Sequence, residues 1–240
     1  EGAILMAIWI PLPKYEERKH VRVEGKLVSK NLADRENEHR MKFILSNFYK
    51  FSFLDIDASN KMQSKIDYVA FDKSQNPCII AESKTRHYLS NDPRLVKGWW
   101  IFEEKMNELL DACIGYKNNR HHPFADKERF ASGKLKAIYV WGFKDGIWVC
   151  DIQKAKIWLC PLQQNAGIKQ HNKFKRNGGK DAAYLVPKNN IGVERVRLSE
   201  IPQLPWTAFE ARHETYLRHP WQDYSKTLCE KTKLNPFYHD

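Results

Sequence analysis

The sequence is poor in cysteine and has none of the cysteine spacings typical of metal sites or disulfide frameworks. Its 240 residues include five cysteines, which are widely spaced and odd in number, and no Cys-x-x-Cys pair occurs. These features argue against a structural zinc site and against a disulfide-stabilised fold. We therefore expect a soluble protein in a reducing, intracellular setting, the cytoplasm.

Long hydrophobic runs and flexible linkers are also missing. The apolar segment at 3–10 lacks a basic leader and is followed by Pro11, and it falls well short of the roughly 20 residues that a membrane span needs. We interpret it as a strand or a packed arm rather than a signal peptide, and we expect no membrane partner. Because no Gly- or Ser-rich linker and no internal repeat divides the chain, we expect one domain over 1–240, with a core at about 30–160 and a β-rich extension at about 161–240.

Basic residues outnumber acidic ones. Lys and Arg total 40 and Asp and Glu total 29, which gives a formal net charge of +11. Such a balance favours a polyanionic partner such as nucleic acid. A basic surface without any such partner fits the composition equally well.

The order of the predicted elements indicates a mixed α/β (α+β) fold, with a central mixed β-sheet flanked by helices and a β-rich C-terminal half. Predicted helices cover 32–50, 95–116 and 207–217. Predicted strands cover 51–57, 66–71, 78–84, 135–143, 147–152, 155–160, 183–186 and 193–198. Polar connectors are expected at 117–134 and 163–181.

The most informative segment is the predicted hairpin at 66–84. Its second strand is apolar until it ends in Glu82-Ser83-Lys84, and because strand side chains alternate, Glu82 and Lys84 project from the same face. Asp67 lies on the preceding strand, within reach of the same patch. Two carboxylates and a lysine on a rigid sheet edge suit a divalent cation beside a water to be activated.

The string Glu-x-Lys is weak evidence by itself, because it recurs in this chain. It also occurs at Glu17–Lys19, Glu24–Lys26 and Glu103–Lys105. The last falls on a predicted helix, where residues two apart do not share a face. The first two have no preceding hairpin acid. Only Glu82-Ser83-Lys84 closes an apolar strand with an aspartate on the strand before it.

With this hairpin and the helix before it, the chain resembles the PD-(D/E)xK nuclease superfamily, which shares the restriction-endonuclease-like fold. The resemblance covers roughly residues 30–120, as a helix, a strand, the hairpin and a second helix. It implies a restriction-endonuclease-like core and a hydrolase acting on phosphodiester bonds. The expected enzyme is a metal-dependent endonuclease that cleaves DNA, with Mg²⁺ or Mn²⁺ as its cofactor.

The same resemblance assigns roles to residues. Asp67, Glu82 and the backbone carbonyl of Ser83 would bind the metal, and Lys84 would orient and polarise the attacking water. Glu38, on the preceding helix, would support the site. One departure is Ile66, which stands where the family pattern has proline.

Alternatives remain at the level of single residues. The hairpin could be an ordinary surface hairpin, Glu38 could be a solvated helix residue, and Asp55 or Asp57 could replace Asp67 if the strands pair differently. Lys97, at the start of the second predicted helix, is a further candidate for lining the site.

The candidate nucleic-acid-binding residues are basic and lie in two places. Arg86 lies two residues after the triplet, and Lys173, Lys175 and Arg176 belong to a polar segment that also contains two adjacent glycines. Cationic side chains of this kind contact phosphates. A nuclease-fold protein that binds nucleic acid without cleaving it, and a protein-interaction module, are the competing hypotheses. A homodimer also remains open.

Overall fold

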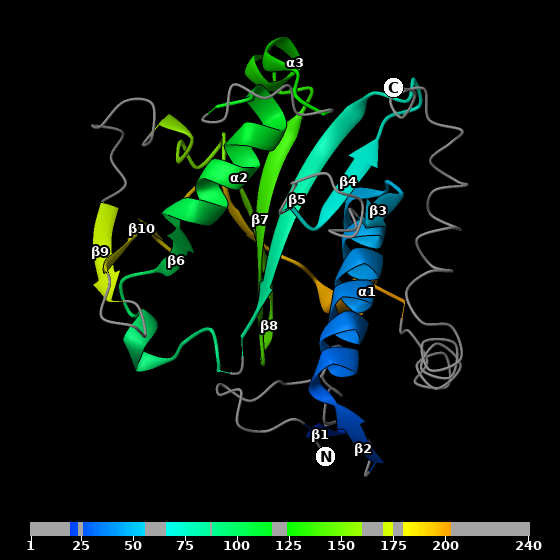
Figure 1. Cartoon of the computed structure of the whole chain (residues 1–240), viewed down its shortest axis with the longest axis vertical. Helices are drawn as coiled ribbons and strands as arrows, with labels where there is room; N and C mark the ends of the chain where they lie inside the picture. Colours follow the sequence, from blue (N-terminus) through cyan, green and yellow to red (C-terminus); the bar gives the residue numbers. More distant parts are fainter. Residues whose placement is uncertain are drawn as a thin grey trace.

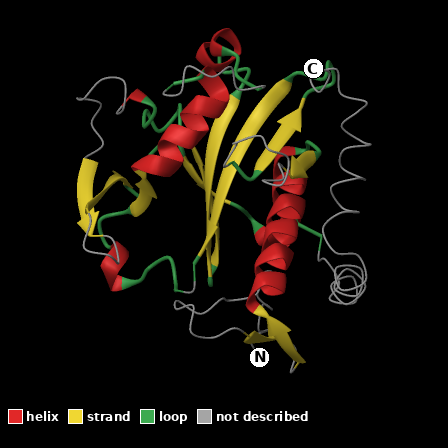
Figure 2. Cartoon of the chain, viewed as in Figure 1, coloured by secondary structure: helices red, strands yellow, loops and turns green. Residues whose placement is uncertain are grey.

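The structure, a computed structural model, describes residues 20–23, 26–55, 66–86, 88–116, 124–159, 170–174 and 180–202. These residues form a mixed α+β fold around a central sheet that contains both antiparallel and parallel pairs. Figures 1 and 2 show the long strands of this sheet between two helices. The expected fold class, a mixed sheet flanked by helices, is confirmed at this level.

The elements have the following bounds. The helices are α1 (Lys30–Tyr49), α2 (Glu103–Ile114) and α3 (Lys127–Ala131), with 3₁₀ turns η1 (Pro93–Leu95) and η2 (Leu198–Glu200). The first strands are β1 (His20–Val23), β2 (Lys26–Ser29), β3 (Phe53–Asp55), β4 (Tyr68–Phe71), β5 (Pro77–Thr85) and β6 (Trp99–Phe102). The later strands are β7 (Lys136–Phe143), β8 (Gly146–Asp151), β9 (Gln170–Phe174), β10 (Lys180–Val186) and β11 (Val193–Arg195).

The central sheet has the strand order β11-β8-β7-β5-β4-β3. Strands β3, β4 and β5 form an antiparallel meander, and β7 then pairs parallel to β5. A parallel pair requires a crossover connection, and here the crossover contains β6, α2 and α3. Strands β5 and β7 therefore occupy the middle of the sheet, where both faces can be covered.

Helices α1 and α2 cover opposite faces of the central sheet. Met41, Ile44 and Leu45 form one buried stripe of α1, and they pack in a cluster that includes the β5 residues Ile79 and Ala81. The α2 residues Met106, Leu109 and Leu110 pack in the other cluster, which includes Ile80 of β5 and Tyr139 and Trp141 of β7. Side chains of β5 alternate between these two cores, as a central strand requires.

The ends of α2 follow from its sequence. It begins directly after β6, with Glu103 and Glu104 in its first turn, where carboxylates stabilise the positive end of the helix dipole. It ends at Gly115, whose φ of +64° is left-handed and whose N–H donates to the carbonyl of Asp111 at 2.9 Å. This is a common C-terminal helix cap. These features explain where α2 begins and where it ends.

The helix predicted over 95–116 is wrong in its first part. Residues 99–102 form β6, which pairs with β10 in a second sheet of order β6-β10-β9. Gly98, with a φ of +141°, lies directly before this strand and prevents a helix from continuing into it. Within the strand, every second residue, Trp99 and Ile101, is buried. Val96, just before this strand, is exposed. Lys97 is exposed and lies in a turn, so it does not line the site from α2.

Further segments also differ from prediction, among them β1 and β2, which were not predicted. Residues 152–158 form turns rather than a strand, because the Asp151 side chain accepts the backbone N–H groups of Gln153 and Lys154 at 3.0 and 3.1 Å. Within the polar connectors, α3 and the strand β9 were not predicted, and the strand predicted at 183–186 begins earlier, at Lys180, as β10. The segments at 3–10 and 207–217 lie outside the described residues.

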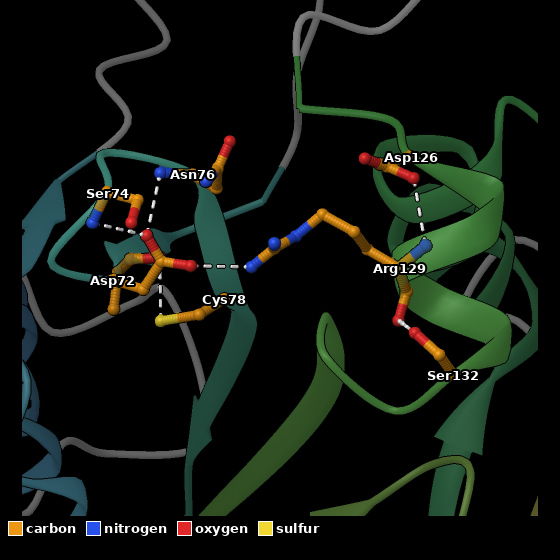
Figure 3. A network of polar contacts seen from close by, with 8 residues as sticks. Asp72, Ser74, Asn76, Cys78, Asp126, Arg129 and Ser132 are labelled. Atoms are coloured by element: carbon orange, nitrogen blue, oxygen red, sulfur yellow. Dashed lines mark hydrogen bonds and ion pairs between the residues drawn. The ribbon is translucent and has the colours of Figure 1, made fainter.

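A polar network fastens the tip of the β4–β5 hairpin to α3 (Figure 3). Asp72 accepts the backbone N–H groups of Ser74 and Asn76 at 2.9 and 3.0 Å, and its other oxygen accepts from the Arg129 guanidinium at 2.7 Å. The hydrogen bond from Asn76, and with it those from Arg129 and Ser74, lowers the pKa of Asp72. Both Asp72 oxygens have partners within the protein, as expected for a structural contact.

In the part of the chain that the structure describes, no helix is both long enough and apolar enough to cross a membrane.

Candidate active site

Asp67 lies just before β4 and is held by β5. Its backbone N–H donates to the carbonyl of Ala81 at 3.1 Å, and its Oδ2 accepts from both the backbone N–H and the hydroxyl of Ser83, at 2.8 and 2.9 Å. Burial raises the pKa of Asp67, while the Ser83 hydrogen bonds and the charges of Lys105 and Lys84 lower it, and the net shift is upward. Asp67 is thus a carboxylate in a fixed position.

Glu82 is brought beside Asp67 by the register of the hairpin. Tyr68 pairs with Ala81, so the next residues along the two strands are Asp67 and Glu82, and residues at such cross-strand positions lie close together. The Glu82 side chain is only 4% exposed. Burial, and next the negative charge of Asp67, raise the pKa of Glu82 to about 8. The strand pairing therefore places the two acids side by side.

The two oxygens of Glu82 differ in their surroundings. Oε1 lies 2.8 Å from the Lys105 ammonium. Oε2 is buried and has no hydrogen-bond partner among the described residues. An unsatisfied oxygen on a buried carboxylate is costly, and such an atom is a suitable ligand for a hard cation.

Lys105 and Glu108 extend the site from α2. The Lys105 ammonium contacts Glu108 Oε2 at 2.9 Å as well as Glu82. Burial lowers the pKa of Lys105, but the hydrogen bonds to the two carboxylates outweigh it and raise the pKa above its usual value. Lys105 therefore carries its charge into a half-buried position between two acids.

Lys84 is exposed and lies two residues after Glu82 on β5. Strand alternation places it on the same face as Glu82, and its charge lowers the pKa of Asp67. The lysine of the triplet is therefore near the carboxylates but open to solvent. Its ammonium is accessible to a substrate that approaches the end of β5.

Glu38 is connected to the site through its backbone. The Tyr68 hydroxyl donates to the Glu38 carbonyl at 3.0 Å and lies 3.4 Å from the Ser83 hydroxyl, which in turn donates to Asp67. This chain of contacts ties α1 to Asp67. The Glu38 side chain itself is exposed, and α1 covers the face of the sheet opposite α2. A carboxylate role for Glu38 stays a prediction.

The remaining acids and basic residues fall in several places. Asp55 pairs with Tyr68 on β3, two strands away from β5, so the strand pairing favours Asp67 over it. Asp57, Lys175 and Arg176 lie outside the described residues. The backbone of Lys173 belongs to β9.

Arg86 follows β5 directly, and its backbone N–H donates to the carbonyl of Gly142 at 2.6 Å. Burial raises the pKa of Tyr139 to about 12, and among the charged groups acting on it are Arg86, Glu82 and Lys105. Arg86 is therefore near the same end of the sheet as the carboxylates.

The donor set of this site suits a hard divalent cation. Asp67 and Glu82 supply carboxylate oxygens, one of them buried and without a hydrogen bond from the described part of the chain, and the Ser83 carbonyl belongs to the same strand end. Oxygen ligands of this kind are those that Mg²⁺ and Mn²⁺ prefer. Across the described ranges, no group of three or more His, Cys, Asp or Glu side chains is arranged to hold a metal ion. Further ligands would come from water or substrate, as is usual for Mg²⁺.

Comparisons with family models, with curated proteins and with solved structures each found no match to this chain. Its function must therefore be inferred from its own residues.

Sequence reasoning missed Lys105 and Glu108. Glu103–Lys105 is correctly excluded as a strand motif, because these residues lie on a helix. The signal that could have found the pair is its spacing, since Lys105 and Glu108 stand three apart on α2, next to the buried Met106 and Leu109. Residues with that spacing share a helix face, and this face packs against the strand that carries Glu82.

Proposed function

We propose that this chain is a divalent-metal-dependent nuclease that hydrolyses phosphodiester bonds, with DNA as its substrate. The observation that carries the proposal is the pair of neighbouring carboxylates Asp67 and Glu82, of which Glu82 keeps a buried oxygen without a hydrogen-bond partner among the described residues. A hard cation is the partner that this oxygen would accept most readily.

The order of the elements gives further support. Helix α1 is followed by the antiparallel strands β3, β4 and β5, then, after β6, by α2, and, after α3, by β7, which is parallel to β5. This is the order that the resemblance to PD-(D/E)xK nucleases leads us to expect for a restriction-endonuclease-like core. In that arrangement, Asp67 and Glu82 fall on the two strands that carry the acids of the family motif.

The roles of the residues follow from their positions. Asp67, Glu82 and the Ser83 carbonyl would hold Mg²⁺ or Mn²⁺, which would stabilise negative charge on the phosphoryl oxygens and promote ionisation of water. Lys84, exposed at the end of β5, would place a cation against the phosphate and orient the attacking water. Ser83 would keep Asp67 in position through its two hydrogen bonds.

The charge of the chain is consistent with this substrate. The formal net charge of +11 favours binding to a polyanion. DNA is proposed as partner on that basis together with the resemblance, and Arg86, Lys173, Lys175 and Arg176 are the proposed phosphate contacts.

The experiment is a cleavage assay on plasmid DNA with Mg²⁺ or Mn²⁺. We expect Asp67→Ala and Lys84→Ala to lower the cleavage rate by at least about 100-fold, because each removes a charge that acts on the transition state. DNA binding, measured separately, should be retained. Lys73→Ala is the matched control, since Lys73 is also exposed but lies at the opposite, turn end of the same hairpin. Undiminished cleavage in both site variants would refute the assignment.

A second candidate is a nucleic-acid-binding protein of the same fold without catalysis. The contact between Lys105 and Glu82 favours it, because this ion pair already supplies a cation to one of the two acids. Calorimetric titration with Mn²⁺ separates the two candidates. Binding that disappears in Glu82→Gln supports the nuclease, whereas the absence of carboxylate-dependent binding supports the second candidate.

A further inference from the structure

Lys105 occupies a position at the site that the proposed nuclease mechanism does not use. Its ammonium lies 2.8 Å from Glu82 Oε1 and 2.9 Å from Glu108 Oε2. The side chains of Glu82 and Glu108 are 4% and 14% exposed. A lysine that reaches between two largely buried carboxylates acts as an internal counter-ion, since buried charges require a partner.

The contact with Lys105 leaves one oxygen of Glu82 without a hydrogen bond from the described residues. Oε2 is buried and has no hydrogen-bond partner among the described residues, although Lys105 contacts Oε1 of the same carboxylate. An arrangement that served only to stabilise the fold would be expected to satisfy both oxygens. This oxygen is therefore available to a further cationic ligand.

The two contacts of Lys105 differ in how they depend on the fold. Glu108 is three residues further along α2, so its contact with Lys105 is local to the helix. The contact with Glu82 crosses from α2 to β5. Because a lysine side chain is long and flexible, its ammonium can leave Glu82 while it stays beside Glu108.

We propose that Lys105 is a displaceable cation: its ammonium contacts Glu82 in the metal-free protein, and a divalent metal ion that binds Asp67 and Glu82 displaces it onto Glu108. Lys105 and Glu108 are then positioning residues that set the metal affinity. This inference rests on the proposed function only in taking Asp67 and Glu82 as the metal ligands.

The proposal has a consequence for the metal-free protein. Without Lys105, the metal-free state would contain Glu82 and Asp67 side by side with no cation between them and α2. With Lys105, an ammonium lies against Glu82 in this state, and the metal has to compete with it. Glu108 favours that exchange, because it retains a partner for the displaced lysine.

The test is a double-mutant cycle in which Mn²⁺ binding is measured by calorimetry at constant pH. The four proteins are the wild type, Glu108→Gln, Lys105→Met and the double variant. In the wild-type background, we expect Glu108→Gln to weaken Mn²⁺ binding about tenfold, because Lys105 then lacks its second partner and stays beside Glu82. In the Lys105→Met background, the same substitution should change Mn²⁺ binding less than about twofold. Equal effects in both backgrounds, or no effect in either, would overturn the proposal.

The matched control is Glu200→Gln. Glu200 also pairs with a basic residue three positions away, Arg197, but both are exposed on the surface. This variant should leave Mn²⁺ binding unchanged. If the wild type binds no Mn²⁺ at all, both the exchange and the proposed nuclease fail; if binding requires Glu82 but the cycle is additive, only the exchange fails.

A crystal structure of the wild-type protein with Mn²⁺ gives a second readout that does not require the variants to fold. The anomalous signal should place the metal at Asp67 and Glu82, and the Lys105 ammonium should lie more than about 4 Å from Glu82, the limit of an ion pair, while it remains beside Glu108. Manganese bound at Glu82 with Lys105 still in contact with that carboxylate would overturn the proposal.

Discussion

At the scale of single residues, the main feature is a carboxylate in surroundings that disfavour its charge. Glu82 is buried beside Asp67 and Glu108, and its pKa is raised to about 8 despite the opposing effect of Lys105. A raised pKa means that the folded protein holds this proton more strongly than the unfolded chain does. Stability and protonation are therefore linked at this residue.

The sign of the linkage gives a prediction for the metal-free protein. Between the ordinary Glu value of 4.5 and about 8, unfolding releases the Glu82 proton, so the free energy of unfolding should fall as pH rises through this window, by at most about 1.4 kcal/mol per pH unit. Glu82→Gln should remove most of this dependence. Urea unfolding at pH 5, 6, 7 and 8 in the presence of EDTA measures the slope.

Two features of this experiment make it specific. Asp67, whose pKa burial also raises, contributes in the same direction, so a small slope should remain in Glu82→Gln. Glu128→Gln, a change at an exposed position on α3, should keep the slope of the wild type. An unchanged slope in Glu82→Gln would contradict the raised pKa.

At the scale of elements, the junction between β6 and α2 determines where Lys105 lies. Gly98 precedes β6 at φ +141°, and a Cβ atom on it would collide with the backbone carbonyl of Val186, the last residue of β10. Strand β6 can therefore pair with β10 only because this position has no side chain. Helix α2 starts directly after that strand.

Replacing Gly98 should therefore disturb the pairing of β6 with β10. We expect Gly98→Ala to lower the free energy of unfolding by more than about 2 kcal/mol, because it combines an unfavourable φ with a backbone collision. Gly133→Ala is the matched control: Gly133 also has a positive φ, +73°, but no atom lies within 4 Å of its Cβ position. It should cost only about 1 kcal/mol. Similar decreases in urea unfolding for both variants would contradict the role of the β10 contact.

At the scale of the whole molecule, a second sheet accompanies the central one. Strands β6, β10 and β9 form this sheet, and β9 is its outer strand. Figure 1 shows this smaller sheet on the α2 side of the central strands. Helix α2 contacts β5 and β7 as well as β6 and β10, so it lies between the two sheets. The hairpin formed by β9 and β10 is thereby linked to the helix that carries Lys105.

The charge of the molecule leads to a prediction about this hairpin. If Lys173, Lys175 and Arg176 bind phosphates, replacing all three by Glu should weaken DNA binding and reduce the dependence of log K on log salt by about one for each phosphate that is no longer neutralised. Fluorescence anisotropy over a range of salt concentrations measures both quantities.

The control for this experiment is a triple Glu variant at other exposed lysines. Lys73, Lys134 and Lys144 are exposed in the described structure, and changing them alters the net charge by the same amount. An equal reduction of the slope in both variants would show that DNA responds to overall charge rather than to the hairpin.

Several elements could be predicted because their patterns are local. The apolar stripe of Met41, Ile44 and Leu45 predicts α1, and the turn residues between two β-favouring runs predict the β4–β5 hairpin. The helix expected at 95–116 began too early, because four apolar residues of β6 do not distinguish a strand from a helix segment. Pairing with β10, far away in the sequence, decided in favour of the strand.

The sequence by itself determined that Glu82 and Lys84 share one face of a strand and that Asp67 begins its neighbour, because strand alternation and hairpin pairing depend only on nearby residues. Only the tertiary structure decided which charges surround Glu82. Burial under α2 raises its pKa, and the same helix brings in Lys105 and Glu108. Such contacts depend on how a helix packs across a sheet, and no local periodicity encodes them.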